Sequence, residues 1–290
     1  MNMVKPLNFQ TIHIIYLVFF LTTLASLDAV RAQETDSAFQ HRPSKISWFF
    51  SPVKWIWQTE KKMFSLTNKN LQAAIVAGTA IAYAFDNRID SYIVREQPIS
   101  SQAEKLDKLG KQVNDFLWFG VLSTGLISRN KGVIRTGRNI IIAEVSANLI
   151  GSIAWYAIGR QRPQYSDNNH TFKPFQNSNL EVKIPPFTRL PSYPSMHAAG
   201  NFSIASVIAH QHGQKYAVPF YIFGAAVGYS RMAREGHYFS DIVGGALLGY
   251  LAGKATVSYF NSAENKKRNS VFIYPLLEKN SLGFNILVQI

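Results

Sequence analysis

The sequence predicts an all-α fold, a bundle of about six core helices followed by a short C-terminal β-hairpin. Six segments rich in Ala, Gly, Leu and Ile are bounded by charged residues or by breaks that contain Gly or Pro, as helices are. None of the six shows the alternation of apolar and polar residues that is typical of a strand. We therefore expect helices over 71–85, 113–128, 138–159, 197–211, 215–230 and 239–260.

The first 32 residues have the three parts of an export signal. Lys5 gives a positive start, residues 14–21 form a short apolar stretch, and residues 30–32 offer a small-residue pattern for cleavage before Gln33. The apolar stretch is short for a membrane span, which takes about 20 residues. Cleavage is therefore favoured over an uncleaved anchor. The protein is expected in the periplasm or at a membrane, with its active site outside the cytoplasm.

Residues 33–70 contain an aromatic and basic segment. Trp and Phe side chains gather over 48–57, beside Lys54. Such a segment either lies on a membrane surface, as Trp-rich amphipathic segments do, or packs over the bundle. The sequence leaves both interpretations open.

The sequence also leaves open whether the helices of the bundle cross a membrane. Most of the six segments are shorter than a span requires, and 138–159 carries Glu144 and Asn148 at its middle, which is costly in lipid. If all six segments crossed the membrane, the positive charge of the connection 129–138 would predict that it lies in the cytoplasm, whereas the export signal would place it outside. The remaining arrangements place the connections 160–195 and 230–238 outside the cytoplasm.

The end of the chain has two short apolar runs, 271–277 and 284–290, separated by a polar turn. This pattern indicates a β-hairpin. The expected organisation is then a signal peptide over 1–32, an aromatic-basic segment over 33–70, a helical bundle over 71–262 and a hairpin tail over 263–290.

Charge and composition limit the partners. The formal net charge is +13, from 30 Lys and Arg against 17 Asp and Glu, which attracts acidic lipids and phosphorylated substrates. Export and the absence of a nucleic-acid-binding motif argue against nucleic acid. The chain has no cysteine, which excludes disulfides and thiolate ligands, and no tight metal-ligand cluster is visible in the sequence. We therefore expect no cofactor and no metal.

The most specific group of polar residues comes near the end of the bundle. Ser230-Arg231 is followed by His237 and, four residues later, by Asp241. On a helix this spacing brings two side chains to one face, so Asp241 is expected to accept a hydrogen bond from one ring nitrogen of His237. That bond would leave the other nitrogen as a lone-pair nucleophile. Arg231 offers a planar guanidinium suited to phosphate oxygens.

Two further groups lie at helix edges. Ser195, Met196 and His197 open the fourth predicted helix, whose N-terminus presents unpaired N–H groups to an anion. Ser195 adds a hydroxyl, and His197 has a proton to donate to a leaving oxygen. Arg160 and Arg162 close the third helix. Each group alone has an ordinary explanation as a cap or a structural hydrogen bond, but together and in this order they indicate phosphate chemistry.

The order Arg-Pro, Pro-Ser-x-His and Ser-Arg-x5-His-x3-Asp resembles the three-part signature of the type 2 phosphatidic acid phosphatase and vanadium haloperoxidase superfamily. The resemblance spans roughly 71–260. It implies a helical bundle with the site at one end, and metal-independent hydrolysis through a phosphohistidine. By this resemblance His237 is the nucleophile, Asp241 orients it, and His197 is first the general acid and then the general base. The resemblance assigns the phosphoryl oxygens to Arg162, Ser195, the amide of Met196, and Arg231.

The sequence departs from the family pattern at two positions. The family usually has Lys seven residues before its first-motif Arg, and here that position is Trp155. One phosphate ligand is therefore missing, unless Arg160 reaches the phosphate. The family usually has Gly between Ser and His, and here it is Met196, whose amide still donates but whose side chain is expected to add bulk near the phosphate.

The sequence thus predicts a phosphoric ester hydrolase acting on phosphate monoesters or diphosphates. Lipid phosphates are favoured as substrates, because the apolar helices and the aromatic-basic segment indicate proximity to a membrane surface. Three alternatives use the same residues: a small-substrate acid phosphatase, a vanadium-dependent haloperoxidase, and a non-catalytic phosphate-binding protein associated with a membrane. The last is motivated by Trp155.

Overall fold

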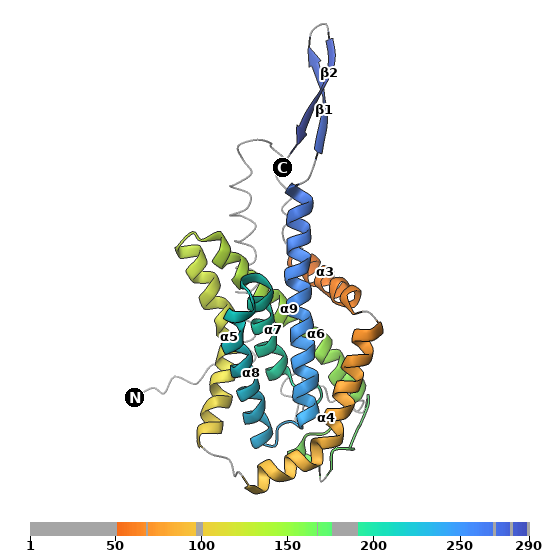
Figure 1. Ribbon diagram of the computed structural model, residues 1–290, viewed down its shortest axis with the longest axis vertical. Helices are drawn as coiled ribbons and strands as arrows, with labels where there is room; N and C mark the ends of the chain where they lie inside the picture. The colour runs from red at the N-terminus through yellow and green to blue at the C-terminus, as the bar shows by residue number, and fades with distance from the viewer. Residues whose placement is uncertain are drawn as a thin grey trace, which may run out of the picture.

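The computed structural model describes residues 51–67, 69–96, 101–166, 168–175, 191–268, 271–278 and 281–288. The expected signal peptide lies outside this part of the chain, as does the segment before residue 51. Figure 1 shows a bundle of helices with the long α9 running through it. The helices are α3 (Ser51–Leu66), α4 (Lys69–Glu96), α5 (Ser101–Ile127), α6 (Lys131–Ile158), α7 (Met196–His212), α8 (Gln214–Ala233) and α9 (Phe239–Arg268).

The predicted helical bundle is confirmed. Each of the six predicted segments lies inside one of α4 to α9 or runs past its end by a single residue. Most of these helices extend well beyond the predicted segments. The largest extension is that of α5, which begins twelve residues before the predicted start at 113. These extensions carry charged residues. The helices continue through them because one side of each still packs, while the other side is exposed.

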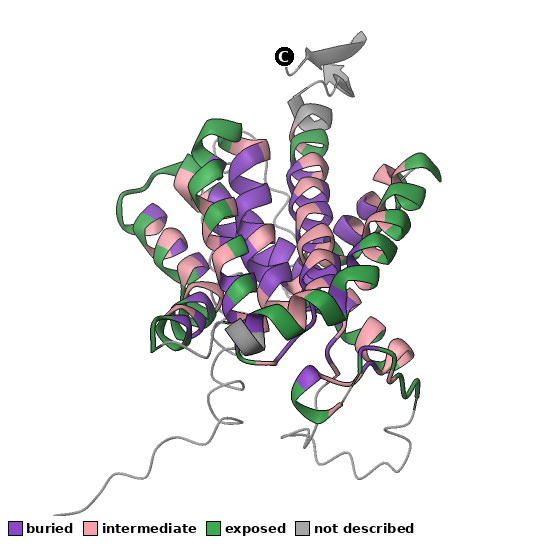
Figure 2. Ribbon diagram, turned by 60° about the horizontal axis from the view of Figure 1, so that its bottom comes forward, coloured by how far each residue is buried: buried purple, intermediate pink, exposed green. Residues whose placement is uncertain are grey.

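The centre of the bundle is the pair α7 and α9, and α7 is buried along most of its length (Figure 2). Three glycines of α9, spaced four residues apart, face α7. A Cβ at Gly245 would meet the carbonyl of Ser195, one at Gly249 the carbonyl of Ala199, and one at Gly253 the side chain of Ser206. The two backbones therefore approach closely because these positions carry no side chain.

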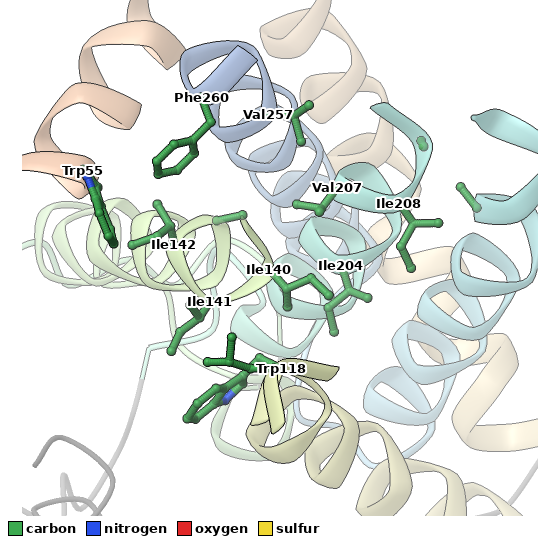
Figure 3. Packing of buried hydrophobic residues seen from close by; sticks show 14 residues of the cluster. Trp55, Trp118, Ile140, Ile141, Ile142, Ile204, Val207, Ile208, Val257 and Phe260 are labelled. Carbon is green, nitrogen blue, oxygen red and sulfur yellow. The ribbon is translucent and has the colours of Figure 1, made fainter. Parts of the chain in front are cut away.

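The main hydrophobic cluster joins α3, α5, α6, α7, α8 and α9 (Figure 3). Trp55 of α3 is 7% exposed and meets Phe260 of α9 edge to face, with ring centroids 5.7 Å apart. Packing over the bundle is thus observed for the part of the aromatic-basic segment that forms α3. The opposite side of α3 still exposes Val53, Trp57 and Phe64, so this helix also presents an apolar surface to its surroundings.

Among the described helices, α6 alone is long and apolar enough to cross a membrane. Its most apolar window has a mean hydropathy of 1.5, and 44% of that window is buried inside the bundle. A core helix of a soluble protein passes the same test, so this feature is weak evidence of a span. Glu144, near the middle of α6, is 7% exposed.

The chain ends in two strands after α9, β1 (Val271–Glu278) and β2 (Ser281–Val288), which pair antiparallel with Val271 opposite Val288. Figure 1 draws them beyond the end of α9, away from the bundle. Their side chains lie outside what the structure describes, so the C-terminal hairpin stays a prediction.

Candidate active site

The three sequence groups meet at one end of the bundle, the lower end in Figure 1, where α8 ends and α9 begins. Backbone hydrogen bonds join them. Ser192 donates its N–H to the carbonyl of Arg160 at 2.8 Å, and Ser195 donates to the carbonyl of Asp241 at 2.9 Å. Gln164 donates to the carbonyl of Glu235 at 3.1 Å. The relative positions of the three groups are therefore set by main chain, which varies little with side-chain rotamers.

His237 is 1% exposed, and its Nδ1 lies 2.8 Å from the carbonyl oxygen of Ser192. A carbonyl accepts and cannot donate, so Nδ1 carries the proton and donates it. In the neutral ring this leaves the lone pair on Nε2. The predicted direct bond to Asp241 is not formed, since the nearest carboxylate oxygen of Asp241 is 3.7 Å from Nδ1, beyond hydrogen-bond distance.

Asp241 lies beside the ring of His237 and also holds the backbone next to it. Its Oδ2 accepts a hydrogen bond from the N–H of Tyr238 at 2.8 Å, which is the reach-back contact of a helix N-terminus. The predicted pairing on one helix face is not formed, because α9 begins at Phe239 and His237 lies before it. Asp241 instead shapes the turn that presents His237.

Arg160 does not serve as the substitute phosphate ligand that the sequence suggested. It is 1% exposed, and its guanidinium bonds Asp86 at 2.6 Å, Asp241 at 2.7 Å and the hydroxyl of Ser240 at 2.7 Å. The ring of Tyr238 covers it, 4.2 Å from the guanidinium carbon. Arg160 is therefore a buried clamp that joins α4 to the start of α9.

The Pro194–His197 turn is held from α6. The indole of Trp155 donates to the carbonyl of Pro194 at 2.8 Å, directly before Ser195, which caps α7 by accepting from Ala198 at 3.4 Å. The side chain of Met196 lies over Gly151 of α6, where an added Cβ would overlap its sulfur. The expected bulk of Met196 is thus taken up between the helices, in the space that glycine leaves.

Arg231 faces α5. Its Nη1 lies 2.8 Å from Asp107 Oδ1, and Arg234 takes the other oxygen of the same carboxylate at 2.7 Å. The Nε of Arg231 is buried and has no hydrogen-bond partner within the described part of the chain. Burial lowers the pKa of Arg162, and the positive charge of Arg231 adds to this effect.

Two residues of the site were missed by the sequence argument. Asp86 directly follows the apolar end of the predicted helix 71–85. An acidic residue at the end of an apolar run was the signal that could have identified it. Asp107 lies in the part of α5 that precedes the predicted helix, so nothing local marked it. Burial would raise the pKa of Asp107, but its hydrogen bond and charge pairing with Arg231, together with His197 and Arg234, hold that pKa below its ordinary value.

Both histidines are neutral at neutral pH in the ligand-free site. Burial lowers the pKa of His237 to about 4, with Asp241 opposing and Arg231 and Arg162 adding to the effect. Burial, Arg231 and His237 lower the pKa of His197 to about 3. A bound phosphoryl group would bring negative charge and raise both values. Within the residues described, no group of three or more His, Asp or Glu is arranged to hold a metal ion.

Comparison with known proteins agrees with the motifs. The model of the PAP2 superfamily matches residues 137–264. The predicted resemblance is confirmed. The matched stretch begins in the second turn of α6 and ends in α9; it contains all three residue groups and supports a phosphoric ester hydrolase. It ends before the hairpin and leaves out α3, α4 and α5.

One solved structure was also found, the crystal structure of the first transmembrane PAP2 type phosphatidylglycerolphosphate phosphatase from Bacillus subtilis. It shares 17% sequence identity, and the alignment covers 74% of this chain and 97% of that chain with a TM-score of 0.40. This likeness is too loose to carry residue roles or a substrate over. No curated protein sequence matches the chain.

Proposed function

We propose that this protein hydrolyses phosphate monoesters or diphosphates, lipid phosphates among them, through a phosphohistidine formed on His237. The observation that carries the proposal is the hydrogen bond from His237 Nδ1 to the carbonyl of Ser192. It places the lone pair on Nε2 in a ring that burial keeps neutral, which is the state that a histidine nucleophile needs.

In the first step Nε2 of His237 attacks phosphorus and the bond from phosphorus to the leaving oxygen breaks. His197 gives its proton to that oxygen, so the leaving group departs as a neutral hydroxyl. The phosphoryl oxygens bind Arg162, Arg231 and the start of α7, where Ser195 and the amide of Met196 add donors. The proton on His197 arrives with the substrate, because the phosphoryl charge raises a pKa that burial and Arg231 otherwise hold at about 3.

In the second step water attacks the phosphoryl group, and the bond from phosphorus to Nε2 breaks. Neutral His197 takes a proton from the water, phosphate leaves, and His237 returns to its neutral form. Asp241, Arg160 and Asp86 keep the turn in place and exchange no proton. Charge on the transferred group is balanced by arginines, where many phosphoryl-transfer enzymes use a metal ion.

The place of action is proposed from two features. The export signal expected over 1–32 directs the chain out of the cytoplasm. The exposed side of α3 carries Trp57 and Phe64 together with Lys54 and Lys61, a combination that binds acidic lipid surfaces. A periplasmic enzyme that reaches lipid phosphates at a membrane face fits both features.

A second candidate is a phosphate-binding protein without turnover, and one observation favours it. Trp155 stands where the family has a cationic ligand, and its indole is committed to Pro194. This candidate predicts that phosphate binds and that no product appears. A vanadium-dependent haloperoxidase would differ from both in oxidising halide once vanadate is bound.

The deciding experiment is phosphate release by the purified mature chain, on phosphatidic acid in micelles and on nitrophenyl phosphate, in excess EDTA. We expect turnover that survives EDTA and is lost in His237→Ala. His210→Ala is the matched control, since His210 lies at the far end of α7 and bonds Ser206, and it should keep full activity.

Unchanged release in His237→Ala would reject the phosphohistidine. Activity that disappears in EDTA and returns with a divalent ion would indicate another class of hydrolase. Tight phosphate binding with no release on either substrate would support the binding protein.

A further inference from the structure

One face of α5 borders the site. Asp107 bonds Arg231 at 2.8 Å, and Asn114 donates its side-chain amide to the carbonyl of His197 at 3.3 Å. These two residues are seven apart, so they lie on the same side of the helix. Lys111 lies between them, four residues after Asp107 and three before Asn114. Its backbone is therefore held between an arginine and a histidine of the site.

Lys111 differs from its two neighbours in being exposed. It stands at the rim of the site, while Asp107 is buried. Its position is on the side of His197, because Asn114, one turn further along α5, bonds the carbonyl of His197 at 3.3 Å, and the positive charge of Lys111 adds to the lowering of the pKa of His197.

We propose that Lys111 determines specificity by favouring substrates whose leaving group carries negative charge, because α5 places Lys111 at the rim of the site, on the side where Asn114 bonds His197. This rests on the proposed function, in which His197 protonates the leaving oxygen and so marks the side from which the leaving group departs. An anionic group on that side approaches Lys111, a neutral group gains nothing from it, and a cationic group is repelled.

The size of the effect follows from the exposure of Lys111. A charge pair at a protein surface is partly screened by water and salt. We expect a change of about tenfold in kcat/KM for an anionic leaving group when the charge at position 111 is reversed. The effect should shrink as salt is added, whereas an effect on packing would not.

The test uses three aryl phosphates that differ in charge away from the scissile bond: phenyl phosphate, 4-carboxyphenyl phosphate and 4-(aminomethyl)phenyl phosphate. In Lys111→Glu, kcat/KM for the carboxyl substrate relative to phenyl phosphate should fall about tenfold, and the same ratio for the aminomethyl substrate should rise. Lys111→Gln should lie between Lys111→Glu and the parent chain.

Lys105→Glu is the matched control. Lys105 is exposed on the same helix, about 120° around it from Lys111, and the variant makes the same change in net charge. Its two ratios should stay close to those of the parent. Equal ratios in Lys111→Glu and the parent, or equal shifts in both variants, would overturn the inference.

The variant His237→Ala distinguishes failure of this inference from failure of the proposed function. If that variant keeps its activity, or if the parent releases phosphate from neither phosphatidic acid nor any of the three aryl phosphates, the proposed function fails and this inference fails with it. If His237→Ala is inactive and the ratios do not respond to position 111, the inference alone fails.

Discussion

Arg160 and Arg231 are both arginines beside the same site, and their surroundings have opposite net charge. Arg160 bonds two carboxylates, those of Asp86 and Asp241, so that group of three charges sums to −1. Arg231 shares the single carboxylate of Asp107 with Arg234, so its group sums to +1. The guanidinium of Arg160 is enclosed, while the Nε of Arg231 is left without a partner in the described structure.

The comparison shows which arginine is able to take an anion. A phosphoryl group entering the Arg160 cluster would meet an excess of negative charge and would have to displace a carboxylate. At Arg231 it meets an unpaired donor and the nearby Arg162, whose own pKa is lowered partly by Arg231. Arg160 and Arg231 thus differ because two carboxylates bond the first, while the second shares one carboxylate with Arg234.

Arg160→Ala should have the largest effect, on stability. The change leaves Asp86 and Asp241 buried without their cation, and breaking a buried pair in this way costs about 3–5 kcal/mol. Unfolding in urea, followed by circular dichroism, should show that loss in the free energy of unfolding. Activity should fall with it, since the turn that presents His237 loses its clamp.

Arg231→Ala is the contrasting variant. We expect a loss of about 10²–10³-fold in kcat/KM, as for removal of one oxyanion donor, with a much smaller change in the free energy of unfolding. Rescue of stability by Arg160→Lys, together with failure of Arg231→Lys to restore kcat/KM, would sharpen the contrast. If both alanine variants lose stability equally, the distinction between a clamp and an anion site is wrong.

The second prediction concerns pH. The pKa of His237 is about 4 in the folded protein against 6.5 for the free side chain, so the unfolded chain takes up a proton first as the pH falls. Keeping the ring neutral contributes about 3 kcal/mol to the free energy of unfolding. This contribution is fully present above pH 6.5 and is lost between pH 6.5 and about 4. Urea unfolding at pH 7 and pH 4 should show this decline.

His237→Gln should show a smaller decline over the same range, by about that amount. Inorganic phosphate should also reduce the decline in the parent chain, because its charge offsets that of Arg231 and Arg162 at the ring. A decline of the same size in His237→Gln and the parent would mean that other groups cause it.

The smallest effect is expected at Trp155. Trp155→Phe keeps an aromatic ring but removes the hydrogen bond to Pro194, which is worth about 1 kcal/mol. We expect kcat/KM to fall by up to about tenfold, because Ser195 and the amide of Met196 follow that turn directly. Trp155→Lys restores a donor and adds the cation found in the family, so it should recover or exceed the parent value of kcat/KM. Equal values for the two variants would indicate that Trp155 only fills space.

Much of this site was predictable from local sequence. Composition located the six helices, because segments rich in Ala, Gly, Leu and Ile, bounded by charged residues or by Gly and Pro, are a property of the chain itself. The spacing of the motifs brought out His237, His197, Arg162 and Arg231, since residue type alone tells which side chains bind phosphate or transfer protons.

The partners of these residues were decided by tertiary structure. His237 is oriented by a carbonyl 45 residues away, and any residue type at Ser192 would supply the same atom, so sequence holds no trace of it. Arg160 is neutralised in part by Asp86, 74 residues earlier, on a helix whose approach depends on how the whole bundle packs. A hydrogen bond forms with whichever acceptor lies within about 3 Å, and that distance is set by three-dimensional packing.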